Sequence, residues 1–269
     1  MDFYTFAITI NIQKRVILCY IFFMGKNDFF NKTKRILKAV LHIKRYDNII
    51  PLGYNCETAF RFYVHYKFIE SSLLTWVYID NFDILLNALQ NLSPIATDDF
   101  AYEMTLYKCL NSGIRFHGRT RDEALSEDNE ESRILIRQDK EELRSRIKYL
   151  KEKFVKTAND GKKNLYVVKI SEEDAENPDI REKVTKLYNF LNGFCKNKFD
   201  FLIITEDKFF NKFLFNEKNI YTRSVEKYAP DETVTNKKMG DKFGWNVLWT
   251  EFRPKKHVWK KKKLKFEQI

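Results

Sequence analysis

At 269 residues and 44% hydrophobic content, the chain is long enough for one large α/β domain or two small ones, which excludes a disordered chain. With only eight glycines and five prolines, it is also poor in the turn residues of a many-stranded sandwich. The net charge of +11 is concentrated at the ends: residues 1–46 hold nine Lys and Arg against two acids, and residues 253–269 hold eight against one. Residues 47–252 hold 31 Lys and Arg against 34 acids, so the body is slightly acidic.

The basic ends suit an anionic membrane surface or a polyanionic glycan, and the alternative is a pair of solvated tails. Nucleic acid is the least favoured partner, because the basic residues of the body do not interleave with aromatic ones and no nucleic-acid-binding module is recognised. From charge alone we therefore expect an anionic membrane surface or a glycan as partner; the acyl or glycan substrate is implied by the resemblance given below.

The first elements in chain order bear on localisation. Residues 16–24 are apolar but too few to span a bilayer, and no small-residue cleavage site follows them. Met24 is an alternative natural start. Residues 29–46 are predicted to form a basic amphipathic helix that packs on the body or lies on an anionic surface. We expect a cytoplasmic protein, peripheral at the inner membrane if these basic ends bind it.

The body alternates buried strands with helices. Strands are predicted at residues 48–52, 164–170, 199–205 and 219–225, the last near a sheet edge. Helices are predicted at 57–66, 82–92, 134–156, 180–195 and 241–252, with strands or loops at 98–117 and an exposed loop at 119–131. This order predicts a mainly parallel sheet flanked by helices in three layers, the α/β class. The expected domains are an N-terminal extension with the basic helix (1–46), one α/β domain (47–252) and a basic tail (253–269).

Cys56 is the most informative residue of the body. The strand at 48–52 runs into a turn containing Gly53, which places Cys56 at the N-terminus of the next helix. Unpaired N–H groups and the helix dipole favour a thiolate there, and a thiolate is the nucleophilic form of cysteine. The alternative is a small buried residue that packs the corner between strand and helix.

The remaining cysteines and the histidines argue against disulfides and metal. Cys19, Cys109 and Cys195 form no CxxC pair with one another or with Cys56, which is typical of a reduced, cytosolic protein. The four histidines lack HxH or HxxxH spacing, so we expect no metal site.

Residues 51–59, Pro-Leu-Gly-Tyr-Asn-Cys-Glu-Thr-Ala, resemble the opening S-L-G-x-N-C-x-x-A motif of bacterial proteins classed as papain-like cysteine peptidases, a domain of unknown function. The later order is also similar: Leu-Thr-Trp at 74–76, Phe-His at 116–117, a long basic helix, two buried strands and a Trp-rich end. The resemblance covers roughly residues 47–252. It departs from the family at Thr75, where the family often has an acid; if that acid orients a base, its role is vacant here or passes to Asp80 or Asp83.

The resemblance implies Cys56 as nucleophile and His117 as the base that activates it. Asn55, together with the backbone N–H groups of Cys56 and Glu57, would donate hydrogen bonds to a developing oxyanion. The alternative for His117 is a surface histidine beside a flexible loop. His65 lies too far along its helix to reach Cys56 without a fold-back.

The Gly-x-Asn-Cys turn also resembles the opening of capsule-biosynthesis proteins that bind coenzyme A. Three functions follow: a cysteine-dependent hydrolase or acyltransferase in bacterial surface-polysaccharide assembly, with a coenzyme A thioester as donor in the acyltransferase case; a papain-like cysteine peptidase; or a non-catalytic protein that binds glycans or a membrane surface. Proximity of Cys56 and His117 separates the first two from the third, and basic residues at the mouth of a narrow tunnel would favour coenzyme A.

Overall fold

The structure is a computed structural model that describes residues 26–92, 95, 99–103, 105–118, 125–126, 128–229 and 240–255. The apolar run at 16–24, which includes Cys19, and the basic tail after residue 255 lie outside the described residues. The chain divides into two compact units, Met1–Lys44 with Val247–Arg253, and Arg45–Asn246 with Pro254–Ile269. The domain boundaries expected at 46 and 252 stay a prediction.

The first unit contains a helix in the region where the sequence predicted one, with a shorter span than expected. This helix is α2 (Lys26–Leu41), and the strand β1 (Lys44–Tyr46) follows it where the sequence predicted further helix. Lys38 lies in the last turn of α2, where a positive charge interacts favourably with the helix dipole.

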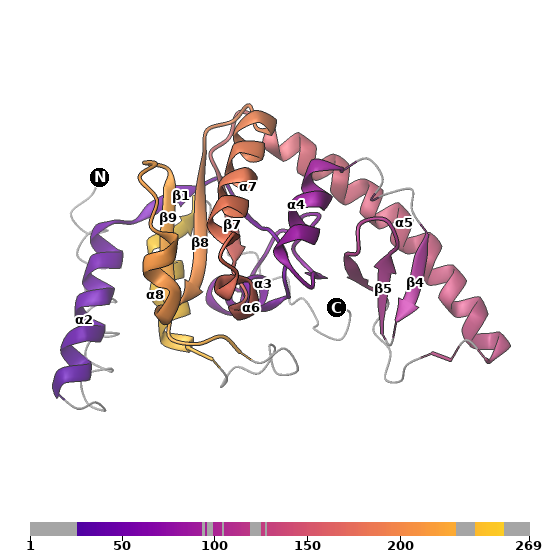
Figure 1. Cartoon of the computed structure of the whole chain (residues 1–269), viewed down its shortest axis with the longest axis horizontal. Coiled ribbons are helices and arrows are strands. Elements are labelled where there is room, and N and C mark those ends of the chain that lie inside the picture. Colours follow the sequence, from indigo (N-terminus) through magenta and orange to yellow (C-terminus); the bar gives the residue numbers. More distant parts are fainter. Residues whose placement is uncertain are drawn as a thin grey trace. The chain divides into compact units, whose positions relative to one another are not determined.

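The parallel sheet of the second unit contains all four predicted strands. These are β2 (Asn48–Pro51), β7 (Asn164–Lys169), β8 (Phe199–Glu206) and β9 (Ile220–Val225), which pair in that order, each parallel to its neighbour. Figure 1 shows β7, β8 and β9 side by side. The register places Ile50 opposite Tyr166 and Tyr166 opposite Phe201. Every residue of β7 is buried, which is why this strand is almost wholly apolar.

Most helices of the body agree closely with the sequence pattern, whereas the short helix α6 (Glu172–Glu176) and the short 3-10 helix η2 (Asp207–Phe213) were not predicted. The others are α3 (Glu57–Tyr66), α4 (Phe82–Gln90), α5 (Glu130–Ala158), α7 (Ile180–Phe194) and α8 (Lys242–Glu251), after which the strand β10 (Phe252–Pro254) ends the described chain. The helix α5 begins earlier than predicted because the Asn129 side chain accepts the N–H groups of Glu131 and Ser132 and so caps it. The α/β class is confirmed, and the three-layer arrangement stays a prediction.

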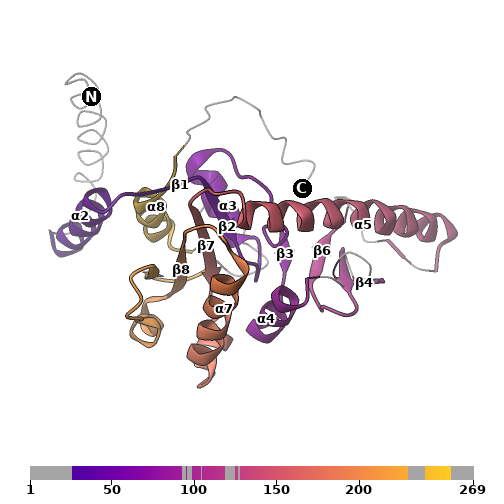
Figure 2. The same ribbon diagram turned by 90° about the horizontal axis from the view of Figure 1, so that it is seen from above.

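A second sheet differs from the expectation of one mainly parallel sheet. The strands β3 (Val77–Tyr78), β4 (Phe100–Glu103), β5 (Leu106–Cys109) and β6 (Arg115–His117) pair antiparallel in the order β3-β6-β5-β4. Strands of two to four residues carry too little periodicity to be recognised from the sequence. The helix α5 runs beside this sheet (Figure 2), and Tyr107 on β5 donates a 2.9 Å hydrogen bond to Asp139 on α5.

One hydrophobic core joins the two sheets. It includes Ile50 and Phe201 from the parallel sheet and Phe100 and Phe116 from the antiparallel one. Burial of each such side chain contributes about 1.5–3 kcal/mol, so the antiparallel sheet is held to the parallel sheet by apolar packing. This packing positions β6, and His117 at its end, relative to β2.

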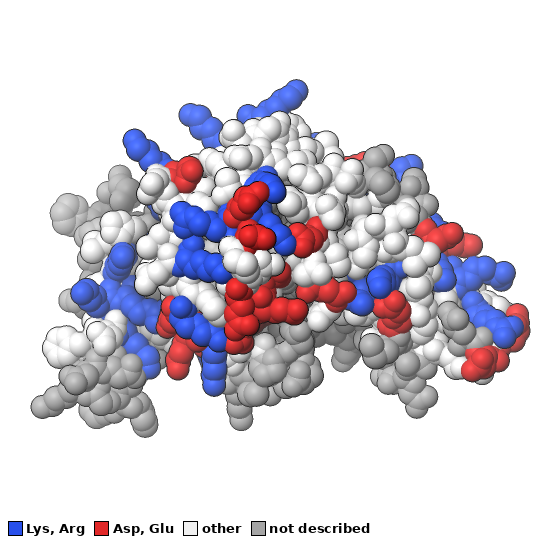
Figure 3. Space-filling view, in the orientation of Figure 1, with Lys and Arg blue, Asp and Glu red and all other residues white. Residues whose placement is uncertain are grey.

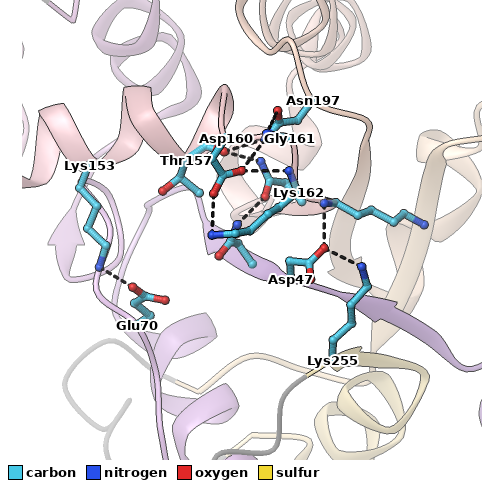
Figure 4. A network of polar contacts seen from close by, with 12 residues as sticks. Asp47, Glu70, Lys153, Thr157, Asp160, Gly161, Lys162, Asn197 and Lys255 are labelled. Atoms are coloured by element: carbon cyan, nitrogen blue, oxygen red, sulfur yellow. Dashed lines mark hydrogen bonds and ion pairs between the residues drawn. The ribbon is translucent and has the colours of Figure 1, made fainter.

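The amino ends of the parallel strands are joined by a polar network (Figure 4). Asn197, just before β8, donates to the carbonyl oxygen of Thr157 at 3.0 Å and accepts the N–H of Gly161 at 2.7 Å. Asp47, just before β2, accepts the N–H of Lys163 at 3.0 Å and the ammonium of Lys255 at 2.6 Å. These bonds fix this edge of the sheet, and the candidate site lies at the opposite, carboxyl edge.

Candidate active site

The turn after β2 has a backbone that few residues can adopt. Gly53 has φ +74°, and a Cβ there would lie 2.4 Å from Cδ1 of Ile79, so another residue would strain the backbone and displace the Ile79 side chain. Tyr54 follows with φ +70°, a left-handed conformation that is costly for a residue with a bulky side chain. The chain is thereby turned sharply between the strand and α3.

Several contacts hold Tyr54 in this conformation. Its carbonyl oxygen accepts the N–H of Ile79 at 2.7 Å, and its buried hydroxyl donates to the carboxylate of Asp174 at 2.5 Å. Asp174 also accepts the N–H of Phe82 at 3.1 Å and the hydroxyl of Ser171 at 2.9 Å. Burial and the neighbouring Asp174 raise the pKa of Tyr54 far above its ordinary value, so the hydroxyl stays protonated and keeps this bond.

Cys56 and His117 lie close together. Cys56 is the N-cap residue of α3, and His117 is the last residue of β6. The Cys56 Sγ and the His117 Nε2 are 3.4 Å apart, within the distance of a thiol–imidazole hydrogen bond. Both side chains are half-buried, so each is accessible from solvent while partly shielded from it. The parallel sheet therefore supplies the thiol and the antiparallel sheet supplies the imidazole.

The surroundings of His117 favour its neutral form. Burial lowers the pKa of His117, and the positive charge of Arg146 lowers it further. Arg146, on α5, also donates a hydrogen bond to the backbone carbonyl oxygen of His117. At neutral pH the imidazole is thus uncharged, and Nε2 can accept a proton from Cys56 when Nδ1 carries the ring hydrogen.

Replacing Arg146 with glutamine is expected to raise the pKa of His117 toward its ordinary value of about 6.5, because the nearby positive charge is lost while burial remains. An NMR titration of the His117 ring measures this change. Arg144→Gln is the matched control, since Arg144 lies on the same helix and binds Asp99 at 2.8 Å. An unchanged His117 pKa in Arg146→Gln, or the same rise in both variants, would contradict the conclusion that the charge of Arg146 lowers this pKa.

The sequence predicted Asn55 as an oxyanion donor, and the structure shows how its side chain is held. Its Oδ1 accepts the N–H of Glu57 at 3.1 Å and the ammonium of Lys169 at 3.2 Å. The N–H of Glu57 is thus engaged within the turn, and its role toward an oxyanion stays a prediction. The donor end of the Asn55 amide stays a candidate.

Lys169 and Glu57 form a buried ion pair that the sequence analysis missed. Lys169 ends β7, and its Nζ lies 3.1 Å from Oε2 of Glu57, with the two side chains 5% and 0% exposed. Glu57 also accepts the N–H of Ala229 at 3.0 Å and lies 3.6 Å from Arg61 Nε. The sequence did contain a signal: Lys169 directly follows the apolar run at residues 165–168 of a buried strand, and a lysine there is costly to bury without a partner.

Neither Asp80 nor Asp83 takes the orienting role that the resemblance left open at Thr75. Thr75 is buried and its hydroxyl accepts the N–H of Ser72 at 2.8 Å. Asp80 forms an ion pair with Arg115, and Asp83 forms one with Lys183. Within the described part of the chain, neither of these acids contacts His117.

Among the described residues, His65, Cys109 and Cys195 have other surroundings than the Cys56–His117 pair. His65 bonds to Asn246 through Nδ1 at 3.2 Å, and His257 is outside the described residues. Cys109 is fully buried. Burial raises the pKa of Cys195, whose thiol donates to the Tyr166 hydroxyl at 3.2 Å. These two thiols are therefore expected to react slowly with alkylating reagents.

A cavity of about 400 Å³ lies at the carboxyl edge of the parallel strands. Asn55 and Lys169 line it, whereas Cys56 and His117 do not, so it adjoins the pair through Asn55. Its lining includes four acids, Asp80, Glu172, Glu173 and Glu206. Acidic side chains also gather on the surface over α6 (Figure 3). The described residues here do not form the basic mouth that would favour coenzyme A.

Among the described residues there is neither a candidate metal site nor a helix able to cross a membrane. No group of three or more His, Cys, Asp or Glu side chains there could hold a metal ion. Among the helices of the same residues, none is both long and apolar enough to cross a membrane.

Comparisons with protein-family models, with curated proteins and with solved structures find no match to this chain. The likeness of residues 51–59 to the cysteine peptidase motif therefore stays a prediction. The assignment of function rests on the residues described above, chiefly on Cys56, His117 and Asn55.

Proposed function

We propose that this protein is a cysteine-dependent acyl-group enzyme, a hydrolase or an acyltransferase, with Cys56 as nucleophile and His117 as general base. The observation that carries the proposal is the 3.4 Å separation between the Cys56 Sγ and the His117 Nε2 at the start of α3. A helix N-terminus stabilises negative charge on the sulfur, and a neutral imidazole can accept the thiol proton.

The reaction consists of two acyl transfers. In the first, the Cys56 sulfur attacks a carbonyl carbon as its proton moves to His117 Nε2, and an oxyanion forms on the carbonyl oxygen. The Asn55 amide donates to that oxyanion. The oxyanion then collapses, the leaving group departs with the proton from His117, and a thioester on Cys56 remains. Water or an acceptor hydroxyl next attacks the thioester, gives its proton to His117, and the thiol is regenerated.

The setting follows from the resemblance and from the charge distribution. We assign the reaction to bacterial surface-polysaccharide assembly, with an acyl or glycan substrate, in the cytoplasm and at the inner membrane through the basic ends. In the acyltransferase case the donor is a coenzyme A thioester. Because the cavity beside Asn55 has an acidic lining, the phosphates of that donor would bind outside it.

The two alternatives have less support. A peptidase of the papain type needs a third residue that orients the base, and neither Asp80 nor Asp83 contacts His117. A non-catalytic role for Cys56 gives no reason for a thiol and an imidazole to meet in a half-buried position.

The pH dependence of iodoacetamide alkylation at Cys56 tests the proposal. We expect an apparent pKa below about 7, against about 8.5 for a free thiol. The reason is that His117 accepts the thiol proton and the N-terminus of α3 stabilises negative charge on the sulfur. Peptide mass spectrometry assigns the label to Cys56, and Cys56→Ser provides the background. Slow labelling with an apparent pKa near or above about 8.5 would mean a structural cysteine and would refute the proposal.

A further inference from the structure

The orientation of the Asn55 amide decides whether this side chain can donate to an oxyanion. An asparagine side chain presents a donor at one end and an acceptor at the other, and rotation by 180° about its last bond exchanges them. Only the donor end can stabilise an oxyanion. For Asn55 to serve the reaction proposed above, something has to hold its amide in one orientation.

Two groups that can only donate face the oxygen of this amide. The backbone N–H of Glu57 lies 3.1 Å from Asn55 Oδ1, and the Lys169 ammonium lies 3.2 Å from the same oxygen. A rotated amide would bring its own N–H₂ group against both donors and lose two hydrogen bonds. Since a bond to a charged group contributes about 1.5–3 kcal/mol, Lys169 supplies much of the preference.

Lys169 is itself held in place from three sides. Its Nζ lies 3.1 Å from the Glu57 carboxylate and 4.3 Å from the centre of the Tyr228 ring, in addition to its bond to Asn55. The residue is only 4% exposed, and it ends β7, the strand adjacent to β2. The ammonium is therefore fixed relative to the turn that carries Asn55 and Cys56.

From these contacts we infer that Lys169 is a positioning residue, which fixes the Asn55 amide with Oδ1 toward the ammonium and with Nδ2 as the donor to the oxyanion of acyl transfer. The ammonium also polarises the amide, which strengthens Nδ2 as a donor. This role rests on the proposed function. It predicts that Lys169 affects reactions that pass through an oxyanion and leaves other reactions of Cys56 unchanged.

Two reactions of the Cys56 thiol test this prediction, one that passes through an oxyanion and one that does not. Acylation by p-nitrophenyl acetate forms a sulfur–carbon bond through a tetrahedral oxyanion and releases p-nitrophenolate, while the thiol proton passes to His117. Alkylation by iodoacetamide displaces iodide and forms no oxyanion. The single-turnover rates of both reactions are measured on the full chain at one pH, after subtraction of the Cys56→Ser background.

We expect Lys169→Met to slow acylation about tenfold or more and Asn55→Ala to slow it by on the order of 10²-fold, with alkylation changed less than about twofold in both. In an Asn55→Ala background, Lys169→Met should have no further effect on acylation. Lys212→Met is the matched control, since Lys212 is partly buried and donates to the carbonyl oxygens of Ala175 and Asn177.

Because Lys169→Met leaves Glu57 buried without its partner, the pair Lys169→Met with Glu57→Gln is measured in parallel and decides the result if the single variant does not fold. The inference is overturned if the Lys169 variants change the rates of acylation and alkylation equally, or change neither rate. It is also overturned if Lys169→Met slows acylation as much in the Asn55→Ala background as in the wild-type background. Failure of the proposed function is a different result, in which wild-type Cys56 is unreactive toward both reagents.

Discussion

Replacement of His117 by alanine is expected to slow acylation of Cys56 at pH 7 by about 10²–10⁴-fold, the usual contribution of a general base. The physical reason is the 3.4 Å contact between Cys56 Sγ and His117 Nε2, which places an uncharged proton acceptor beside the thiol. Without it, the sulfur has to lose its proton to water before it can attack.

The dependence of the acylation rate on pH follows from the pKa of His117. Burial and Arg146 lower the pKa of His117, so the imidazole is protonated and unable to accept a proton only below its ordinary range. Wild-type acylation should therefore fall on the acid side, with a midpoint below about 6.5, and should be level at pH 7. In His117→Ala the rate should keep rising toward the pKa of a free thiol, about 8.5.

The measurement is the burst of p-nitrophenolate at a series of pH values. His65→Ala is the matched control, since His65 lies on α3 but bonds to Asn246. Equal rates for wild type and His117→Ala between pH 6 and 8 would remove His117 from the mechanism and leave its contact with Cys56 without a catalytic role.

Replacement of Glu57 by alanine is expected to lower the free energy of unfolding by about 3–5 kcal/mol, because it leaves buried positive charge without its partner. Glu57 is 0% exposed, and its carboxylate lies 3.1 Å from Lys169 Nζ and 3.6 Å from Arg61 Nε. The N–H of Ala229 also loses its acceptor. A loss of this size is a large fraction of the stability of a typical domain.

Urea unfolding followed by circular dichroism measures the change. Glu57→Gln, which keeps an acceptor for the N–H of Ala229, should lose less stability than Glu57→Ala. Glu182→Ala is the control, since Glu182 pairs with Lys186 on the surface of α7, and its urea midpoint should not change. A loss below about 1 kcal/mol in Glu57→Ala would show that water or another group compensates the buried charges.

Much of the parallel half of the fold could be predicted from the sequence. The strands β7 and β8 contain apolar runs at residues 165–168 and 201–204, and α3 was predicted with its observed ends, Glu57 and Tyr66. Elements with a strong period are local properties of the chain and can be recognised without tertiary contacts. The antiparallel sheet was not predicted, because strands as short as β3, with two residues, have no period to recognise.

Only the local features of the candidate site could be predicted from the sequence pattern; its contacts between residues distant in the sequence could not. Gly53 and the adjoining strand indicated that Cys56 begins a helix, and Cys56 is the N-cap residue of α3. The choice of His117 came from a resemblance, since it is 61 residues away and no local rule brings it to Cys56. The roles of Cys56, His117 and Asn55 in catalysis stay predictions. The partnership of Lys169 with Asn55, across 114 residues, depends on the pairing of β2 with β7 and could not be predicted from spacing.

The separation of these residues along the chain also sets the order in which the site is completed during synthesis. Cys56 and His117 leave the ribosome well before Lys169, which is 112 residues beyond Glu57. Until β7 has emerged, β2 lacks its sheet neighbour, and the Glu57 carboxylate lacks the ammonium that allows its burial. A nascent chain that ends before β7 therefore contains both the thiol and the imidazole while the turn that carries the thiol is still unsupported. The acyl-transfer activity proposed above should therefore be absent from nascent chains that end before β7.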